Sequence, residues 1–276
     1  MQIVFWGAQP WQSGVVGNMI GTAFMMSELY GGRSLMMQTR LSCPDLDYAL
    51  FPDSGGSHIR EEGRYFQEIG LDAVLNDAIL KFQQKERFSR HVLEVKRDRI
   101  YYLPGTYKNN REVFEHHLFH HLESVLETAE YFGENLFLDC SGESGMVCER
   151  MMELADVIVI NVPQSPHQIE KLPSLILGKE EKLIYLIGQH NEKSKYHINN
   201  IRRRYHIPKE QIAAIPYNVE FDDALSEGKS VRFLEQNSSI KKKDFNYELI
   251  QELREAAKLI QKKAEHKKEQ EREKEV

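Results

Sequence analysis

The sequence lacks a cysteine framework, a long hydrophobic run and a dominant charge, and each absence excludes a class of protein. Its three cysteines, Cys43, Cys140 and Cys148, form no CxxC pair, so neither a disulfide framework nor a zinc ribbon is expected. No apolar run approaches the roughly 20 residues that span a bilayer, and the first six residues contain no basic n-region. We therefore expect a cytoplasmic protein with reduced thiols.

The charge balance is weakly acidic. Among 276 residues, 36 Lys and Arg oppose 42 Asp and Glu, a formal net charge of −6. An apolar fraction of 41% beside 28% charged residues is typical of a folded, soluble chain that buries a substantial core. The acidic excess argues against nucleic acid as a partner, because phosphate neutralisation requires a positive surface.

Short apolar, β-branched runs alternate with helix-period stretches, which predicts an α/β fold. Most of these runs are apolar on both faces, so the strands should form a doubly wound, mostly parallel sheet with helices on both faces. We expect one such domain over residues 1–235. The predicted strands are 2–6, 34–39, 99–103, 135–139, 156–162, 182–188 and 211–215. The predicted helices are 18–30, 71–84, 111–132, 145–154, 168–177 and 196–205.

The last segment, residues 244–276, changes character. Its apolar residues recur at helical spacing, at Phe245, Leu249, Leu253, Ala257 and Ile260. We predict a C-terminal amphipathic helix that runs into a solvated charged tail and either packs on the domain or binds a partner. The charges of the tail are mixed and it carries no aromatic residue, so we do not expect it to contact a membrane.

Two segments have the form of nucleotide-binding elements. After the first strand, residues 7–18 read Gly-Ala-Gln-Pro-Trp-Gln-Ser-Gly-Val-Val-Gly-Asn and lead into a helix. Strand, glycine-containing loop and helix N-terminus form the arrangement in which backbone N–H groups cradle a phosphate. The apolar strand 135–139 ends in Asp139, as a Walker B strand does.

These motifs, followed by 155–163, 194–196, 214–217 and 224–229, occur in the order seen in one family. Over residues 1–235 the chain resembles the ParA/MinD-type deviant P-loop ATPases. The resemblance implies a P-loop NTPase fold and a homodimer that sandwiches ATP and switches between partners.

The chain departs from that family where the chemistry is done. The family loop reads Lys-Gly-Gly-x-Gly-Lys-Thr, and its positions fall on Gln12, Ser13, Gly14, Val15, Val16, Gly17 and Asn18. Both lysines are absent, and an amide replaces the hydroxyl that would bind Mg²⁺. Phosphoryl transfer depends on positioning and on neutralising charge, so ATP hydrolysis should be slow or absent.

The retained residues leave ATP and Mg²⁺ binding open. The resemblance assigns the nucleotide to the loop and to the Pro216–Tyr217 turn, with Asp139 holding Mg²⁺ through water. The structural alternative is that Gly14 and Gly17 serve a tight turn and that Asp139 is a hydrogen-bonded carboxylate at a strand end. We assign no catalytic residue and no directly bound metal.

Two further clusters have a structural interpretation. His116, His117, His120 and His121 form i,i+4 pairs that could chelate zinc, but a zinc site needs a third ligand, and we interpret them as flank residues of a helix. The basic run 202–204 is Arg-Arg-Arg, and we interpret it as a solvated helix face.

We predict a degenerate ParA/MinD-like pseudo-ATPase, similar to the TadZ/CpaE group. It would act as a non-hydrolysing scaffold or positioning factor for an envelope, pilus or secretion assembly, recruited to the inner face of the membrane by a protein partner. One alternative is a weak ATPase switch that takes cations from a partner chain or from Arg33 or Arg40. Another is a DNA-binding or nucleoid-binding partition protein that uses Arg202 to Arg204.

Overall fold

The computed structural model describes residues 1–40, 45–52, 69–80, 84–106, 110–142, 145–170 and 176–274. Within these residues one sheet has the strand order β3-β4-β2-β5-β1-β6-β7-β8. Its neighbouring strands are parallel except β3 and β4, which are antiparallel. The predicted doubly wound sheet is confirmed. The strands are β1 (Gln2–Trp6), β2 (Ser34–Gln38), β3 (Leu93–Lys96), β4 (Ile100–Leu103), β5 (Asn135–Asp139), β6 (Val157–Val162), β7 (Leu183–His190) and β8 (Ile212–Pro216).

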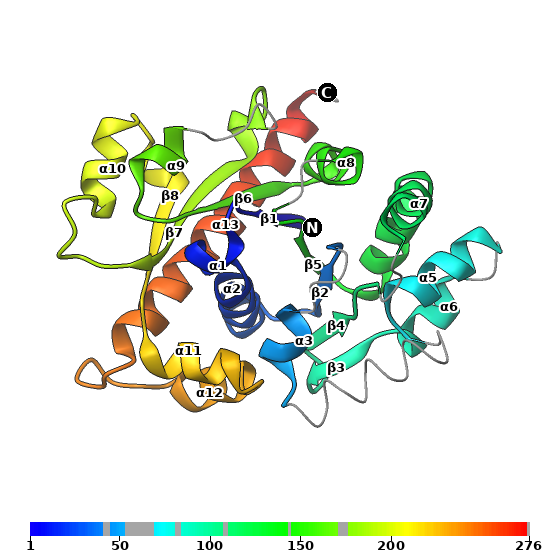
Figure 1. The fold of residues 1–276 in the computed structure, drawn as a ribbon, viewed down its shortest axis with the longest axis horizontal. Coiled ribbons are helices and arrows are strands. Elements are labelled where there is room, and N and C mark those ends of the chain that lie inside the picture. The colour runs from blue at the N-terminus through cyan, green and yellow to red at the C-terminus, as the bar shows by residue number, and fades with distance from the viewer. Residues whose placement is uncertain are drawn as a thin grey trace.

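Helices cover both faces of the sheet, as Figure 1 shows. One face carries α2 (Val15–Tyr30), α3 (Asp45–Leu50), α11 (Val219–Ser226), α12 (Ser230–Asn237) and α13 (Tyr247–Lys274). The other carries α5 (Gly70–Ile79), α7 (Arg111–Phe132), α8 (Met146–Leu154), α9 (Pro166–Glu170) and α10 (Ile198–Arg204). The remaining short helices are α1 (Pro10–Ser13), α6 (Gln84–Arg87) and the 3₁₀ turns Phe88–Arg90, Glu180–Lys182 and Lys209–Gln211.

Alternate side chains along each strand pack into two separate hydrophobic cores, one on each face of the sheet. In β1, Ile3 and Phe5 belong to the core under α2 and α13, whereas Val4 and Trp6 belong to the core under α7 and α8. Successive strand residues point to opposite faces, so a strand covered on both sides must be apolar throughout. This requirement explains why the strand runs were readable in the sequence.

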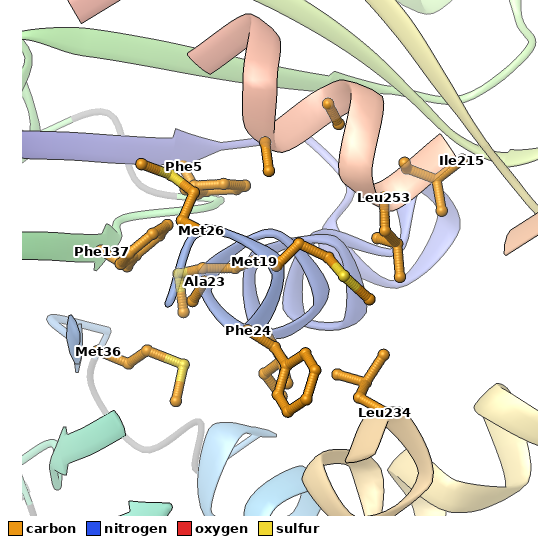
Figure 2. Packing of buried hydrophobic residues seen from close by; sticks show 14 of the residues in the cluster. Phe5, Met19, Ala23, Phe24, Met26, Met36, Phe137, Ile215, Leu234 and Leu253 are labelled. Carbon is orange, nitrogen blue, oxygen red and sulfur yellow. The ribbon is translucent and has the colours of Figure 1, made fainter. Parts of the chain in front are cut away.

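Helix α2 lies at the centre of the first core. In Figure 2 its residues Met19, Ala23 and Met26 lie among side chains from the sheet and from α13, while Phe24 points toward Leu234 of α12. A helix surrounded in this way is apolar on nearly all sides and shows little amphipathic pattern.

The C-terminal helix α13 is part of the same core. Leu249, Leu253, Ala257 and Ile260 are buried, as their spacing indicated, and α13 packs on α2 and β8. The inclusion of Phe245 in this stripe is wrong, because Phe245 precedes α13 and is 69% exposed. The close approach depends on Gly21 of α2, because a Cβ there would lie 2.5 Å from Leu253 Cδ2. Residues 247–264 therefore add to the α/β domain rather than standing apart from it.

A half-buried ion pair holds the C-terminal part of α13. Lys267 Nζ lies 2.9 Å from Asp156 Oδ1, and the Gln2 backbone N–H donates to Asp156 Oδ2 at 2.8 Å. Burial alone would raise the pKa of Asp156, but these hydrogen bonds and the nearby positive charges together hold the pKa below its usual value. The carboxylate therefore stays charged at neutral pH and ties α13 to the start of β6.

The sequence patterns missed several short elements. Strand β3 and helices α1, α3, α11 and α12 were not predicted, because four to eight residues carry too little periodicity. The helix predicted over 71–84 is wrong in length: α5 ends at Ile79 and α6 begins at Gln84, with 81–83 outside the described residues. The helix predicted over 168–177 begins instead at Pro166, and its residues 171–175 also lie outside the described part.

Truncating the side chain that joins α2 and α13 should destabilise the whole domain. We expect Leu253→Ala to lower the free energy of unfolding by about 2–5 kcal/mol, since it leaves a cavity at a fully buried position. Chemical denaturation followed by circular dichroism measures this loss. Lys262→Ala, at an exposed position of the same helix, is the matched control and should change stability by less than about 0.5 kcal/mol. Equal effects in the two variants would contradict the assigned packing.

Candidate functional site

The segment expected to be an open phosphate loop is folded into helical turns. Gln12 and Ser13 donate their backbone N–H groups to the Gln9 carbonyl at 3.1 and 3.2 Å. Gly14 donates to the Pro10 carbonyl and adopts a left-handed φ of 62°, which ends α1 and starts α2. Asn18 N–H bonds to the Gly14 carbonyl at 2.9 Å. These four N–H groups are therefore already bonded within the segment, and glycine at position 14 serves the turn.

The side chain of Asn18 fills the space beneath the segment. Its Nδ2 donates to the Ser13 carbonyl at 3.1 Å and to Asn161 Oδ1, from β6, at 2.9 Å. Asn161 in turn donates to the Trp6 and Val159 carbonyls at 3.4 and 3.3 Å. All of these groups are buried, so the position that would carry a Mg²⁺-binding hydroxyl instead holds a hydrogen-bonded amide bridge.

The segment also packs tightly on the sheet. A Cβ at Gly188, in β7, would lie 1.8 Å from the Ser13 carbonyl oxygen. The backbone of the loop therefore rests directly on the backbone of β7. A carbonyl oxygen, which repels phosphate, occupies this contact.

Two further loop positions, Val15 and Gly17, serve packing. Val15 is fully buried in the core, and a Cβ at Gly17 would lie 2.8 Å from Leu225 Cδ1 of α11. Gly17 thus allows α11 to approach α2 at the position where the family has its second lysine. Val16 is half-buried and lines a neighbouring pocket, whereas Gln12 is exposed.

Asp139 is paired with a cation of the chain itself. Its side chain is fully buried at the end of β5, where Oδ1 accepts the Ser141 N–H at 2.9 Å and Oδ2 lies 3.3 Å from Arg40 Nη2. The same guanidinium lies 2.6 Å from Asp45 Oδ2 of α3. Arg40 reaches this place because β2 pairs with β5 in the register Gln38 to Asp139. The arginine supplies the positive charge that a metal would otherwise bring.

The Pro216–Tyr217 turn lies at the end of β8, apart from this cluster. Tyr217 donates its backbone N–H to the His190 carbonyl at 3.2 Å, and its ring is 56% exposed. His190 is buried and its Nε2 accepts the Ile198 N–H at 3.2 Å. Burial lowers the pKa of His190 more than nearby Glu192 raises it, in keeping with a neutral ring that accepts a hydrogen bond.

A pocket of about 300 Å³ opens beside the folded loop. Gly14, Val16 and Gly17 line it from one side and Leu225 from another, so its wall is largely apolar. Two carboxylates, Asp45 and Asp222, also line it, and they disfavour a bound phosphate. The other lining residues are Pro10, Tyr48, Ala49, Gln189 and Ser226.

The other candidate residues take no part in this cluster. Arg33 precedes β2 and Arg40 follows it, so the two side chains belong to opposite ends of this strand. The Arg33 guanidinium stacks 5.4 Å from the Phe132 ring centroid. On α10, Arg204 is paired with Glu170 at 3.0 Å. His116 and His120 contact each other through their Nε2 atoms, 3.1 Å apart, on an exposed flank of α7.

The described residues contain neither a metal-binding cluster nor a membrane-spanning helix. No group of three or more His, Cys, Asp or Glu side chains in this part of the chain could hold a metal ion. Nor does any helix within it have the length and apolar character needed to cross a membrane.

The sheet order and the helix arrangement match those of solved ParA and MinD proteins. A ParA family ATPase from Chlorobium tepidum superposes with a TM-score of 0.70 at 15% identity, covering 93% of this chain and 98% of its own. The chain has the ParA/MinD-type P-loop fold. No protein-family model and no curated protein matches the sequence.

Two similar structures of the same fold contain nucleotide. A plasmid partition protein from Borrelia burgdorferi, bound to AMPPNP, gives a TM-score of 0.64 at 14% identity and covers 95% of this chain and 98% of its own. MinD from Pyrococcus horikoshii, in complex with Mg-ADP, superposes with a TM-score of 0.63 at 14% identity. The match covers 97% of this chain and 99% of the MinD chain.

Sequence reasoning missed one residue of the cluster and left another open. Asn161 had no assigned role, although an amide inside the buried strand Val-Ile-Val-Ile-Asn-Val is a visible signal, since a buried polar group needs a partner. Arg40 was considered as a catalytic cation, but its pairing with Asp139 and Asp45 depends on strand register. No local pattern in the sequence contains that information.

Adding a methyl group at Gly188 should disrupt the contact between the folded loop and the backbone of β7. We expect Gly188→Ala to cost about 3 kcal/mol of stability, because the new Cβ collides with a backbone carbonyl that cannot turn away. Thermal unfolding measures the loss. Gly145→Ala is the control: the nearest atom to its new Cβ is 4.0 Å away, and it should cost about 1 kcal/mol or less. An unchanged melting temperature in Gly188→Ala would show that the loop does not rest on β7.

Removing the charge of Arg40 should leave Asp139 as an unpaired buried carboxylate. We expect Arg40→Met to destabilise the protein by about 3–5 kcal/mol, and the double variant Arg40→Met with Asp139→Asn to regain part of that loss. A double-mutant cycle in denaturant gives the coupling between the two side chains. Additive effects of the two substitutions would contradict the ion pair.

Proposed function

We propose that this chain is a pseudo-ATPase of the ParA/MinD fold, a non-hydrolysing scaffold or positioning factor. The observation that carries the proposal is the closure of the phosphate-loop segment by the chain itself. The Asn18 amide bridges the Ser13 carbonyl and Asn161 where a phosphate and its metal would need room. Two proteins of this fold were solved with AMPPNP or Mg-ADP, but each is only 14% identical to this chain, so the likeness extends to the fold alone.

The charges around the loop support the same proposal. The loop sequence lacks both family lysines, and the carboxylates Asp45 and Asp222 line the adjacent pocket. A triphosphate would meet negative charge there and would have no loop lysine to neutralise it. Arg40, the nearby cation, is engaged by two carboxylates.

The scaffold would act through protein contacts. We infer a homodimer formed through the carboxyl edge of the sheet, and a protein partner in an envelope, pilus or secretion assembly that recruits the chain to the inner face of the membrane. The support is the fold, together with the family resemblance of the degenerate loop to the TadZ/CpaE group. An interaction screen that recovers no envelope or secretion protein would count against this part of the proposal.

Titration with ATP and Mg²⁺ tests the central claim. We expect no heat of binding up to millimolar ATP and no change in the size of the particle on gel filtration, because the N–H groups of residues 12–14 and 18 are bonded within the segment and the Asn18 amide occupies the space beneath it. Micromolar binding with a shift from monomer to dimer would overturn the proposal. It would mean that the loop opens to admit phosphates.

A weak ATPase is the second candidate, and the position of Arg40 beside Asp139 favours it. In that case steady-state phosphate release, measured with and without a partner, would exceed background. It would fall to background in Arg40→Gln. Arg33→Gln is the matched control, since Arg33 lies at the opposite end of β2 and should leave phosphate release unchanged.

A further inference from the structure

Two of the three cysteines lie in contact behind the carboxyl edge of the sheet. Cys140 directly follows Asp139 at the end of β5, and Cys148 lies in the first turn of α8. Their Sγ atoms are 3.0 Å apart, and the Cys148 thiol also faces the Cys140 carbonyl at 3.8 Å. A disulfide requires about 2.05 Å between the sulfurs, so closure needs a movement of about 1 Å.

A small cavity lies beside Cys148, a residue that is only 2% exposed. The cavity is about 20 Å³, enough for about one water molecule, and Cys148 lines it whereas Cys140 does not. Glu115, Gly145 and Val147, which are half-buried, form its outer side. Thr39 and Glu115 are the polar residues that line it: the Thr39 hydroxyl donates to the Asp139 carbonyl at 3.2 Å, and Glu115 is paired with Arg111 at 2.7 Å.

We propose that Cys140 and Cys148 are a peroxide-sensitive thiol pair that forms a reversible intramolecular disulfide. Cys148, which faces the cavity, is the thiol that reacts with hydrogen peroxide, and Cys140 is the resolving thiol. The inference is independent of the proposed scaffold role, because it rests on the geometry of the two sulfurs and the cavity.

The chemistry balances in two steps. The Cys148 thiol gives up its proton as its sulfur attacks one oxygen of hydrogen peroxide, the O–O bond breaks, and the departing hydroxide takes up that proton and leaves as water, so that Cys148 becomes a sulfenic acid. The Cys140 sulfur then attacks the sulfenic sulfur, the S–O bond breaks, and a second water leaves as the S–S bond forms. In total two thiols are oxidised by two electrons and one peroxide is reduced to two waters.

The disulfide would act on the segment that carries Asp139. Ser141 donates its N–H to the Asp139 carboxylate, and Gly142 donates to the Gly7 carbonyl at 2.9 Å, where the folded loop begins. A covalent link from Cys140 to Cys148 fixes this segment to α8. The oxidation state of the pair would thus set how freely the carboxyl edge of the sheet can rearrange.

The experiment uses the full chain with Cys43→Ser, so that the pair alone remains. After treatment with hydrogen peroxide and alkylation in denaturant, we expect intact mass spectrometry to give a loss of two hydrogens with no alkylated cysteine. Peptide mapping should give a crosslink between 140 and 148, and dithiothreitol should restore both thiols. Two alkylatable thiols after peroxide treatment of the folded protein would overturn the proposal.

Two single variants separate the roles of the thiols. In the Cys43→Ser background, Cys140→Ser should accumulate a sulfenic acid at Cys148 that dimedone traps, because the resolving thiol is gone. Cys148→Ser should leave Cys140 unmodified, because Cys140 does not line the cavity. Dimedone labelling of Cys140 instead of Cys148 would overturn the assigned order. Oxidation of the pair at the same rate by the bulkier oxidant diamide would contradict access through the cavity.

Discussion

A carboxylate that is fully buried needs a compensating charge, and the pairing of Asp139 with Arg40 determines what the carboxyl edge of this sheet can do. In a nucleotide-binding site the charge opposite such a carboxylate is a hydrated metal ion. In this chain a guanidinium supplies it, and the same guanidinium holds Asp45 at the start of α3. The carboxyl edge of the sheet therefore holds one guanidinium between two carboxylates, so that Asp139 has a cation of the chain itself within ion-pair distance.

In the folded loop, too, polar groups are bonded to other groups of the chain. Backbone N–H groups bind phosphate only when no carbonyl has taken them, and in residues 12–14 and 18 each has a carbonyl partner within the segment. Opening the loop for a phosphate would break these bonds and would separate the buried Asn18 Nδ2 from the Ser13 carbonyl and from Asn161 Oδ1. Each buried polar group left without a hydrogen bond costs about 1–3 kcal/mol, and this cost would weaken the binding of a nucleotide by the same amount.

The sequence predicted the layers of the fold much better than the state of the loop. Strands covered on both faces must be apolar throughout, so β1, β5 and β6 could be predicted from short apolar runs. The buried stripe of α7 could be predicted from the helical spacing of its apolar residues. The resemblance then supplied the topology. The loop was different: its glycines at 14 and 17 fit an open phosphate loop as well as a closed turn. The choice between the two depends on Asn161 and Gly188, which lie far along the chain.

The glycines show that residues of a phosphate-loop motif can be required by packing alone, whether or not the loop binds phosphate. Gly14 provides a left-handed turn, Gly17 makes room for Leu225, and Gly188 makes room for the Ser13 carbonyl. Each is required by a close approach of protein to protein, so the packing of the fold suffices to explain all three. Because α11 occupies the space beside Gly17, restoring a lysine there would require α11 to move as well. Placing a lysine at position 17 would thus demand a coordinated change in the loop and in α11, so these two segments constrain each other's sequence.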